Sequence, residues 1–391
     1  MRFKTTVENL KKAVIKASGT LPVKTISEAL NNYLIIAEKG EVTITANNLT
    51  TAIITRCPAE ITEEGKALVD GKRFTDLIKS FSDGNMELDI SLDIKENSLN
   101  IKYGKSKTKF ASLNPAEYPA LPQIEKWDSQ TALKQEDLRK AILNTVFVIS
   151  DTNPNAVLNG VNFSLYNSRL SIISLSSASV AVRHMEVPIA TDVAYNFTIP
   201  LSSAGELRKA LTDKDDTDIL LEESKSAGYV KITLKDSVFI IRTLAGEYPY
   251  KMVNQISSLP STIPEKMEVK FDRKMLLEII NRSLLLTDKM FNEALIISTV
   301  GTDLRLQRQS NFGNLDEYIE VEKTYGGTAL TDETKKKEIK KGINPVNLRD
   351  VLSNITDDTV SIVTGIEANV PYILQSEDYF YAIMPVNMRK E

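Results

Sequence analysis

Apolar residues recur at the helical spacing i, i+3, i+4, i+7 in six segments, two in each third of the chain. This spacing places the apolar side chains on one face of an amphipathic helix, which we expect to pack on a sheet. The first helix of each third carries Leu10, Ala13, Val14 and Ala17, then Leu138, Ala141 and Ile142, then Leu276, Ile279 and Ile280. The second carries Phe74, Leu77, Ile78 and Phe81, then Ala204, Leu207 and Leu211, then Leu348, Val351, Leu352 and Ile355.

Runs of β-type residues with short turns lie between the helices. In the first third the pattern predicts strands over residues 33–37, 42–46, 51–56, 86–92, 99–103 and 107–113. Lys39-Gly40 and Glu96-Asn97 mark hairpin turns, and Gly104-Lys105-Ser106 is read as a turn rather than a phosphate loop. Each third therefore predicts an α+β domain of two helices packed on antiparallel strands.

Internal repetition indicates three copies of this unit. Glu117-Tyr118-Pro119 recurs as Glu247-Tyr248-Pro249 at an offset of 130, and the helical segment from Val69 matches segments that begin at Ile199 and Ile343. Repetition at a fixed long offset is typical of duplicated domains. Leu-Pro and Ile-Pro steps near residues 122–128 and 257–264 interrupt the pattern. The sequence thus predicts similar domains at 1–125, 128–254 and 263–391.

Composition restricts the class of protein. The 391 residues include 48 basic and 52 acidic ones, so the net charge of −4 is opposite to that of a typical nucleic-acid binder. Any role on DNA must therefore depend on where the charges lie. The single cysteine, Cys57, excludes an internal disulfide and agrees with a reducing compartment. No leader and no apolar run long enough to span a membrane is present, so we expect a cytoplasmic protein.

Catalytic chemistry has little support. His184 is the only histidine, which excludes the common zinc-enzyme sites, and its alternating surroundings favour a strand surface residue over a catalytic base. Carboxylates are plentiful, but no spacing singles out a pair for glycoside hydrolysis. We therefore expect no enzyme activity, no catalytic residues, no metal and no cofactor. A hydrolytic enzyme built on repeated β-rich domains remains the alternative from another class.

Basic residues recur by position on the helix faces opposite the apolar ones. A solvated helix face often carries such residues, but their repetition across the copies favours a shared cationic surface. The run of residues 335–341 predicts a solvated loop before the last helix. The recurring cations are Lys11, Lys12, Lys16, Arg139, Lys140 and Arg282 on the first helices, and Lys72, Arg73, Lys79, Arg208, Lys209 and Arg349 on the second.

Three motifs carry a resemblance to a known family: the Leu158-Asn159-Gly160 turn, the Glu-Tyr-Pro closings and the C-terminal Tyr381-Ala382-Ile383-Met384-Pro385-Val386. Together with the length and the threefold repeat, they make the whole chain resemble the bacterial DNA sliding clamp, the β subunit of replicative DNA polymerase III. The resemblance implies three domains of the DNA-clamp fold in a crescent that dimerises into a ring. Such a homodimer would encircle double-stranded DNA without sequence specificity and act as a cytoplasmic, nucleoid-associated processivity factor.

The resemblance also implies three sets of functional residues. Lys24 joins the recurring cations as a residue that faces DNA. The dimer interface would contain Thr108 and Phe110 from one subunit and Leu285 and Leu286 from the other. An apolar groove would bind a short peptide of the replicative polymerase, the clamp loader and other proteins. Its implied residues are Leu158, Leu175, Val180, Pro249, Asn344, Val370, Ile383, Met384, Pro385, Val386 and Met388.

The chain departs from the family pattern in three places. Residues 175–180 read Leu-Ser-Ser-Ala-Ser-Val where the family usually has a Thr-Asp-Gly-His-Arg-Leu type segment, which leaves the partner peptide consensus open. Residues 24–29 lack the two usual prolines, and residues 389–391 extend past the usual end. A main clamp and a clamp-like paralogue with a specialised adaptor role would both fit this sequence.

Overall fold

The computed structural model describes residues 1–24, 27–150, 152–188, 194–212, 217–263, 265–287, 294–326, 328–329 and 338–386. The chain divides into two compact units. Unit 1 comprises Met1–Arg139 and Val187–Leu244, and unit 2 comprises Lys140–Glu186 and Ala245–Glu391. Each unit combines helices with antiparallel strands.

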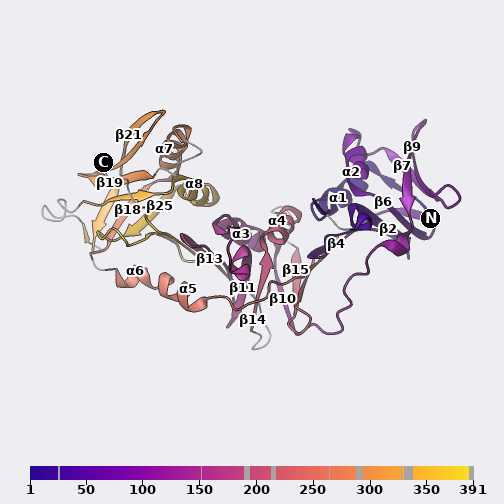
Figure 1. Ribbon diagram of the computed structural model, residues 1–391, viewed down its shortest axis with the longest axis horizontal. Coiled ribbons are helices and arrows are strands. Elements are labelled where there is room, and N and C mark those ends of the chain that lie inside the picture. The colour runs from indigo at the N-terminus through magenta and orange to yellow at the C-terminus, as the bar shows by residue number, and fades with distance from the viewer. Residues whose placement is uncertain are drawn as a thin grey trace. The chain divides into compact units, whose positions relative to one another are not determined.

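Unit 1 contains helices α1 (Val7–Ser18), α2 (Gly71–Ser80) and α4 (Leu201–Ala210) and the short helices η1 (Glu28–Asn31) and η2 (Pro115–Glu117). The side chain of Thr6 accepts the Asn9 N–H at the start of α1, and Asp70 accepts the Arg73 N–H at the start of α2. Such N-caps satisfy backbone donors that have no partner inside the helix. Helices α1 and α2 pack side by side (Figure 1), with their predicted apolar faces buried.

One antiparallel sheet of thirteen strands runs through the described part of unit 1. Its order is β10-β15-β16-β17-β4-β3-β2-β6-β9-β8-β7-β1-β5. The strands predicted for the first third are confirmed, whereas β1, β5 and β6 were not predicted. The bounds are β1 (Arg2–Thr6), β2 (Asn32–Glu38), β3 (Glu41–Asn47), β4 (Thr51–Cys57), β5 (Glu60–Glu63), β6 (Gly65–Asp70), β7 (Glu87–Asp93), β8 (Ser98–Tyr103), β9 (Ser106–Leu113), β10 (Ser129–Lys134), β15 (Asp218–Ser224), β16 (Tyr229–Thr233) and β17 (Ser237–Arg242), with β14 (Tyr195–Pro200) also in this unit.

In unit 2, strands β11-β12-β13-β27-β26-β25-β18-β22-β23 follow one another in one sheet, and β21-β20-β19-β24 form a second. The strands are β11 (Gly160–Tyr166), β12 (Arg169–Leu175), β13 (Ser179–Glu186), β18 (Met267–Asp272), β19 (Leu295–Val300), β20 (Asp303–Ser310), β21 (Gly313–Glu320), β22 (Glu322–Tyr325), β23 (Thr328–Ala329), β24 (Lys340–Ile343), β25 (Thr359–Thr364), β26 (Tyr372–Gln375) and β27 (Tyr379–Ile383). The helices are α5 (Tyr250–Ser257), α6 (Leu259–Thr262), α7 (Arg273–Leu285) and α8 (Pro345–Asn354), with the short η3 (Val146–Val148) and η4 (Ala156–Asn159). Helix α3 (Gln135–Thr145) begins in unit 1 and ends in unit 2.

One sequence-based expectation is wrong in part. Residues 340–341 belong to strand β24 rather than to a solvated loop, and Lys341 is only 2% exposed because β24 pairs with β19 in the core of unit 2. The predicted boundary at residues 257–264 contains helix α6 and the end of α5. Pro260 lies in the first turn of α6, where the missing N–H of proline costs no hydrogen bond.

Membrane-spanning helices are not found in the described part of the chain.

We predict that Phe74→Ala destabilises unit 1. Phe74 is fully buried, and its ring centroid lies 6.3 Å from that of Tyr33 and 5.9 Å from that of Phe110. The loss of the ring leaves a cavity, which should reduce the free energy of unfolding by about 3–5 kcal/mol. Urea unfolding followed by the fluorescence of Trp127, the chain's only tryptophan, measures the change. The control Ile94→Ala, at a side chain 76% exposed, should change it by less than about 0.5 kcal/mol; an equal loss in both variants would contradict the prediction.

Candidate functional site

A basic surface lies over α1 and α4 in unit 1. Lys11, Lys12 and Lys16 of α1 and Lys209 of α4 line a cavity of about 430 Å³. Ile15, which is 46% exposed, contributes to its apolar floor. The structure thus brings four of the predicted DNA-facing cations together on one surface, which we call the basic helix face.

Each of the four cations of the basic helix face has a partner within the protein. The distances from Nζ to a carboxylate oxygen are 2.6 Å for Lys12 to Glu8, 2.6 Å for Lys16 to Asp236 and 2.9 Å for Lys209 to Glu206. Lys11 Nζ instead donates to the carbonyl oxygens of Lys79 and Phe81 at the C-terminal end of α2. A lysine at a helix C-terminus also stabilises the negative end of the helix dipole. The carboxylates reduce the positive field of this surface without removing it.

The remaining predicted cations do not line this cavity. Arg73 pairs with Asp70, Arg282 with Glu317 and Arg349 with Asp350. Arg139 and Arg208 are half-buried. The side chains of Lys24, Lys72, Lys79 and Lys140 are exposed.

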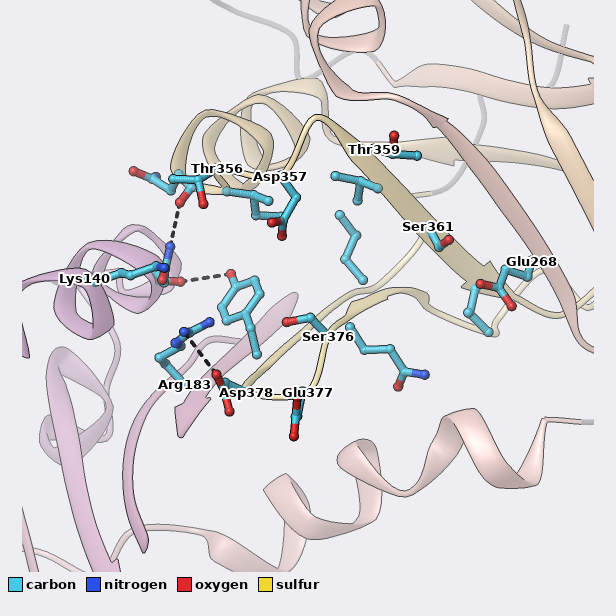
Figure 2. A pocket seen from close by; sticks show the side chains of 18 residues that line it. Lys140, Arg183, Glu268, Thr356, Asp357, Thr359, Ser361, Ser376, Glu377 and Asp378 are labelled. Carbon is cyan, nitrogen blue, oxygen red and sulfur yellow. Dashed lines mark hydrogen bonds and ion pairs between the residues drawn. The ribbon is translucent and has the colours of Figure 1, made fainter. Parts of the chain in front are cut away.

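Lys140 borders a polar cavity of about 440 Å³ in unit 2 (Figure 2). Asn144 of α3 donates from Nδ2 to the carbonyl oxygen of Asn354 at 2.6 Å, and Tyr379 donates from its hydroxyl to the carbonyl oxygen of Asn144 at 2.9 Å. These bonds join α3 to the ends of α8 and β27. None of the predicted groove residues lines this cavity. Its charged residues are Lys140, Arg183, Glu268, Asp357, Glu377 and Asp378, so carboxylates outnumber cations.

The predicted peptide groove lies above an apolar cluster of unit 2. Leu175 and Val180 are paired in neighbouring strands β12 and β13 and are 3% and 1% exposed, respectively. Leu158 is half-buried against the same cluster, which also contains Val253 of α5. Ile383 is 1% exposed and belongs to the neighbouring core. These largely buried residues can therefore contribute only to the floor of the predicted groove and not to its open surface.

More accessible predicted residues surround this floor. Met384 is 43% exposed, and its N–H donates to the carbonyl oxygen of Ala178 at 2.8 Å. Val386 donates its N–H to the carbonyl oxygen of Gly342 at 3.0 Å. Asn344 caps α8 by accepting the N–H of Val346 at 2.9 Å. Pro249, Val370 and Pro385 are half-buried, and Met388 lies outside the described residues.

Sequence reasoning missed one polar side chain beside this groove. Lys341 Nζ donates to Thr364 Oγ1 and to the carbonyl oxygen of Val370, at 3.0 Å in each case. Burial lowers the pKa of Lys341 to about 8, an effect that the charge of Glu367 opposes. Helix α5 was missed as well, although Tyr250, Val253 and Ile256 follow a spacing of three residues that could have indicated it.

The predicted dimer residues lie on strand β9 and at the end of helix α7, which packs beside strand β21. Strand β9 pairs with β8 along its length but with β6 only at Ser112 and Leu113, so the described structure leaves its other edge open from Ser106 to Ala111. Thr108 and Phe110 lie on this stretch, and both are half-buried. Strand β21 is the edge of its sheet, beside α7. On α7 and just after it, Leu285 is 81% exposed and Leu286 is half-buried.

Neither His184 nor Cys57 has the surroundings expected of a catalytic residue. His184 lies on strand β13, as predicted, with its Nδ1 atom 2.8 Å from Ser171 Oγ. Burial lowers the pKa of His184 to about 4, with a further contribution from Arg169. Burial also raises the pKa of Cys57 to about 11, which makes the thiol a poor nucleophile near neutral pH. Among the described residues, no group of three potential metal ligands is found.

Family models match two parts of the chain. The model of the DNA polymerase III beta subunit N-terminal domain matches residues 1–122, and the model of its central domain matches residues 132–250. The two matches together cover more than half of the chain. None of these matches favours the alternative of a hydrolytic enzyme.

Individual relatives are similar to this chain over nearly its whole length. The "Beta sliding clamp" of Halalkalibacterium halodurans is 26% identical, over 96% of this chain and 94% of the relative. The sliding clamp structure from Bacillus subtilis has a TM-score of 0.86 at 23% identity and covers both chains completely. A Pseudomonas aeruginosa sliding clamp solved bound to griselimycin has a TM-score of 0.85 at 20% identity, over 99% of this chain and 100% of that one. With helices on antiparallel sheets and two consecutive family models matched, the chain belongs to the DNA polymerase III beta subunit family, the bacterial beta sliding clamps.

Proposed function

We propose that this sliding clamp works as a homodimeric ring of similar domains, residues 1–125, 128–254 and 263–391 in each copy, with duplex DNA in the hole. Membership of the beta sliding clamp family carries this proposal. The clamp is a processivity factor and not an enzyme, so its task is to hold a replicative polymerase at its template in the cytoplasm, on the nucleoid. A clamp-like paralogue that is never loaded onto DNA would fail the loading experiment below.

The basic helix face and the exposed Lys72 and Lys79 support contact with DNA phosphates. Their cations lie on helices of unit 1 and are repeated by position along the chain. Phosphate contacts of this kind fix the position of a duplex without reading its sequence. Because carboxylates pair with several of the cations, the attraction is moderate, and the closed ring retains the DNA.

The open edges of β9 and β21 support ring closure. An exposed strand edge offers unpaired N–H and C=O groups to another strand. We propose that the β9 edge of one subunit pairs with the β21 edge of its partner, with Leu285 and Leu286 covered beside it. Exposed lysines, Lys105 and Lys107, occur on the β9 side, and Glu320 occurs at the end of β21, so the two edges carry opposite charges.

The groove around Met384 is proposed to bind the clamp-binding peptides of the polymerase, the clamp loader and other partners. Its floor is the apolar cluster under Leu175 and Val180, and Met384 offers an adaptable side chain at the surface. The bound griselimycin in the Pseudomonas aeruginosa clamp makes this compound a suitable probe for the groove.

Met384→Ala should weaken the binding of griselimycin about tenfold, or about 1.4 kcal/mol, because the exposed thioether loses its contacts with the ligand. Isothermal titration calorimetry measures the affinity, and analytical ultracentrifugation should show an unchanged dimer. Met275→Ala is the matched control, since Met275 is 54% exposed on α7. Dissociation of Met384→Ala into monomers would show that this residue belongs to the subunit interface instead.

Lys72→Glu combined with Lys79→Glu should weaken the contact with DNA. Two lost phosphate contacts reduce the slope of log K against log salt on linear duplex by about 2. A second measurement tests the ring with the wild-type protein. After loading onto nicked circular DNA with clamp loader and ATP, the protein should stay bound to the circle and should be released when the circle is cut. Lys95→Glu, in the exposed turn between β7 and β8, serves as the control. An unchanged salt slope in the double variant would show that α2 does not contact DNA. Retention of the wild-type protein on linear DNA would contradict the ring.

Leu285→Asp should convert the dimer into monomers at micromolar concentration. An aspartate placed in a covered apolar contact loses its hydration without gaining a partner. Sedimentation equilibrium should give a dimer for the wild type and a dissociation constant raised at least about a hundredfold for the variant. The control is Ile94→Asp, another exposed apolar residue. A stable dimer of Leu285→Asp would place the interface elsewhere.

A further inference from the structure

We propose that Lys341 is a positioning residue of the peptide groove, which holds the loop of residues 365–371 in the shape that a ligand requires. The proposal rests on the proposed groove. Lys341 lies in the lysine-rich run of residues 335–341, which the sequence analysis predicted to be a solvated loop, yet its amine is buried. Lys341 does not touch the ligand in this account, because it is 2% exposed.

The geometry ties this amine to one wall of the groove. Lys341 Nζ donates to the carbonyl oxygen of Val370, a predicted groove residue, and to Thr364 Oγ1 at the end of β25. Thr364 directly precedes the loop and Val370 is its last residue but one, so one ammonium group ties the two ends of the loop together. The amine also lies 5.7 Å from the centroid of the Tyr372 ring, directly after the loop. The tyrosine hydroxyl donates to the carbonyl oxygen of Lys341 at 3.3 Å.

The loop has few other backbone restraints. Strand β25 pairs with β26 only at Ile362 with Leu374 and at Val363 with Ile373. The N–H of Val370 donates to the carbonyl oxygen of Glu367 at 3.2 Å, and the hydroxyl of Thr364 donates to the carbonyl oxygen of Val370 over a longer distance of 3.5 Å. Pro371 has no N–H to donate. The bonds from Lys341 therefore account for a large share of what holds Val370 in place.

The next residue on β24 holds the opposite part of the predicted groove. Gly342 forms an antiparallel bridge with Val386, and an added Cβ at Gly342 would lie 2.7 Å from the carbonyl oxygen of Val386. One short strand thus fixes Val370 through a side chain and Val386 through its backbone. The spacing between the two groove segments follows from this common attachment.

A purely structural role would be served better by an apolar side chain. Among the described residues, no carboxylate lies within ion-pair distance of the buried amine, and burial disfavours its charged form. Burial of a charged group without an opposite charge beside it costs free energy of folding. The buried lysine therefore lowers the stability of unit 2, whereas its hydrogen bonds hold the loop of residues 365–371 in position.

The test compares Lys341→Met with Lys340→Met, which removes the exposed neighbouring lysine on the same strand. Full-length dimers are studied with griselimycin as the probe, by calorimetry, thermal unfolding and amide hydrogen exchange. Lys341→Met should raise the dissociation constant about tenfold. It should also accelerate exchange of the Val370 N–H selectively, with an unfolding temperature equal to or above that of the wild type. Lys340→Met should match the wild type in all three measurements.

Two results would overturn the positioning role alone. One is wild-type affinity in Lys341→Met. The other is weaker binding together with a lower unfolding temperature and faster exchange throughout unit 2, which would mark Lys341 as an ordinary structural residue. Thr364→Val removes one acceptor of Lys341 and the 3.5 Å bond from Thr364 to Val370, but it keeps the shorter bond from Lys341 to Val370, so it should give a smaller loss of affinity. Absence of griselimycin binding by the wild type itself would overturn the groove assignment and this role together.

Discussion

The packing of one apolar helix face on an antiparallel sheet is the interaction on which the surfaces of this molecule depend. Leu10 and Val14 of α1 are fully buried, so the opposite face of the same helix must carry Lys12 and Lys16 outward. The period of 3.6 residues that forms the core therefore also fixes the positions of the cations. A shift of one residue in this pattern would disturb both the core and the charged surface.

The charges of the basic helix face suit a protein that retains DNA without binding it tightly. Non-specific binding with dissociation constants of about 10⁻⁴ to 10⁻⁶ M and association near 10⁷ M⁻¹s⁻¹ gives a lifetime of about 1–100 ms on DNA. A closed ring lengthens this lifetime without stronger contacts. Pairs such as Lys16 with Asp236 and Lys12 with Glu8 keep the surface only moderately positive. Strong attraction to phosphate would instead oppose sliding.

Local patterns predicted much of the fold, and the reason is visible in particular residues. The turn at Asn97, which has a positive φ of 43°, and the apolar face of α2 depend on neighbours within a few positions. Lys341 could not be predicted in this way, because its acceptors lie 23 and 29 residues further along the chain. The exposure of Leu285 likewise depends on the end of α7 and the strands beside it rather than on its own apolar character.

The predicted groove shows where such long-range features collect. Its floor joins β12 and β13 to β27, and Met384 is held by Ala178 across this junction. Local preferences would place a lysine of β24 in water, yet Lys341 is buried where it can hold a loop. Natural proteins break such local rules mainly where function requires it, and stability elsewhere compensates. The well-packed core of unit 2 thus allows this region to keep a side chain that stability alone would not select.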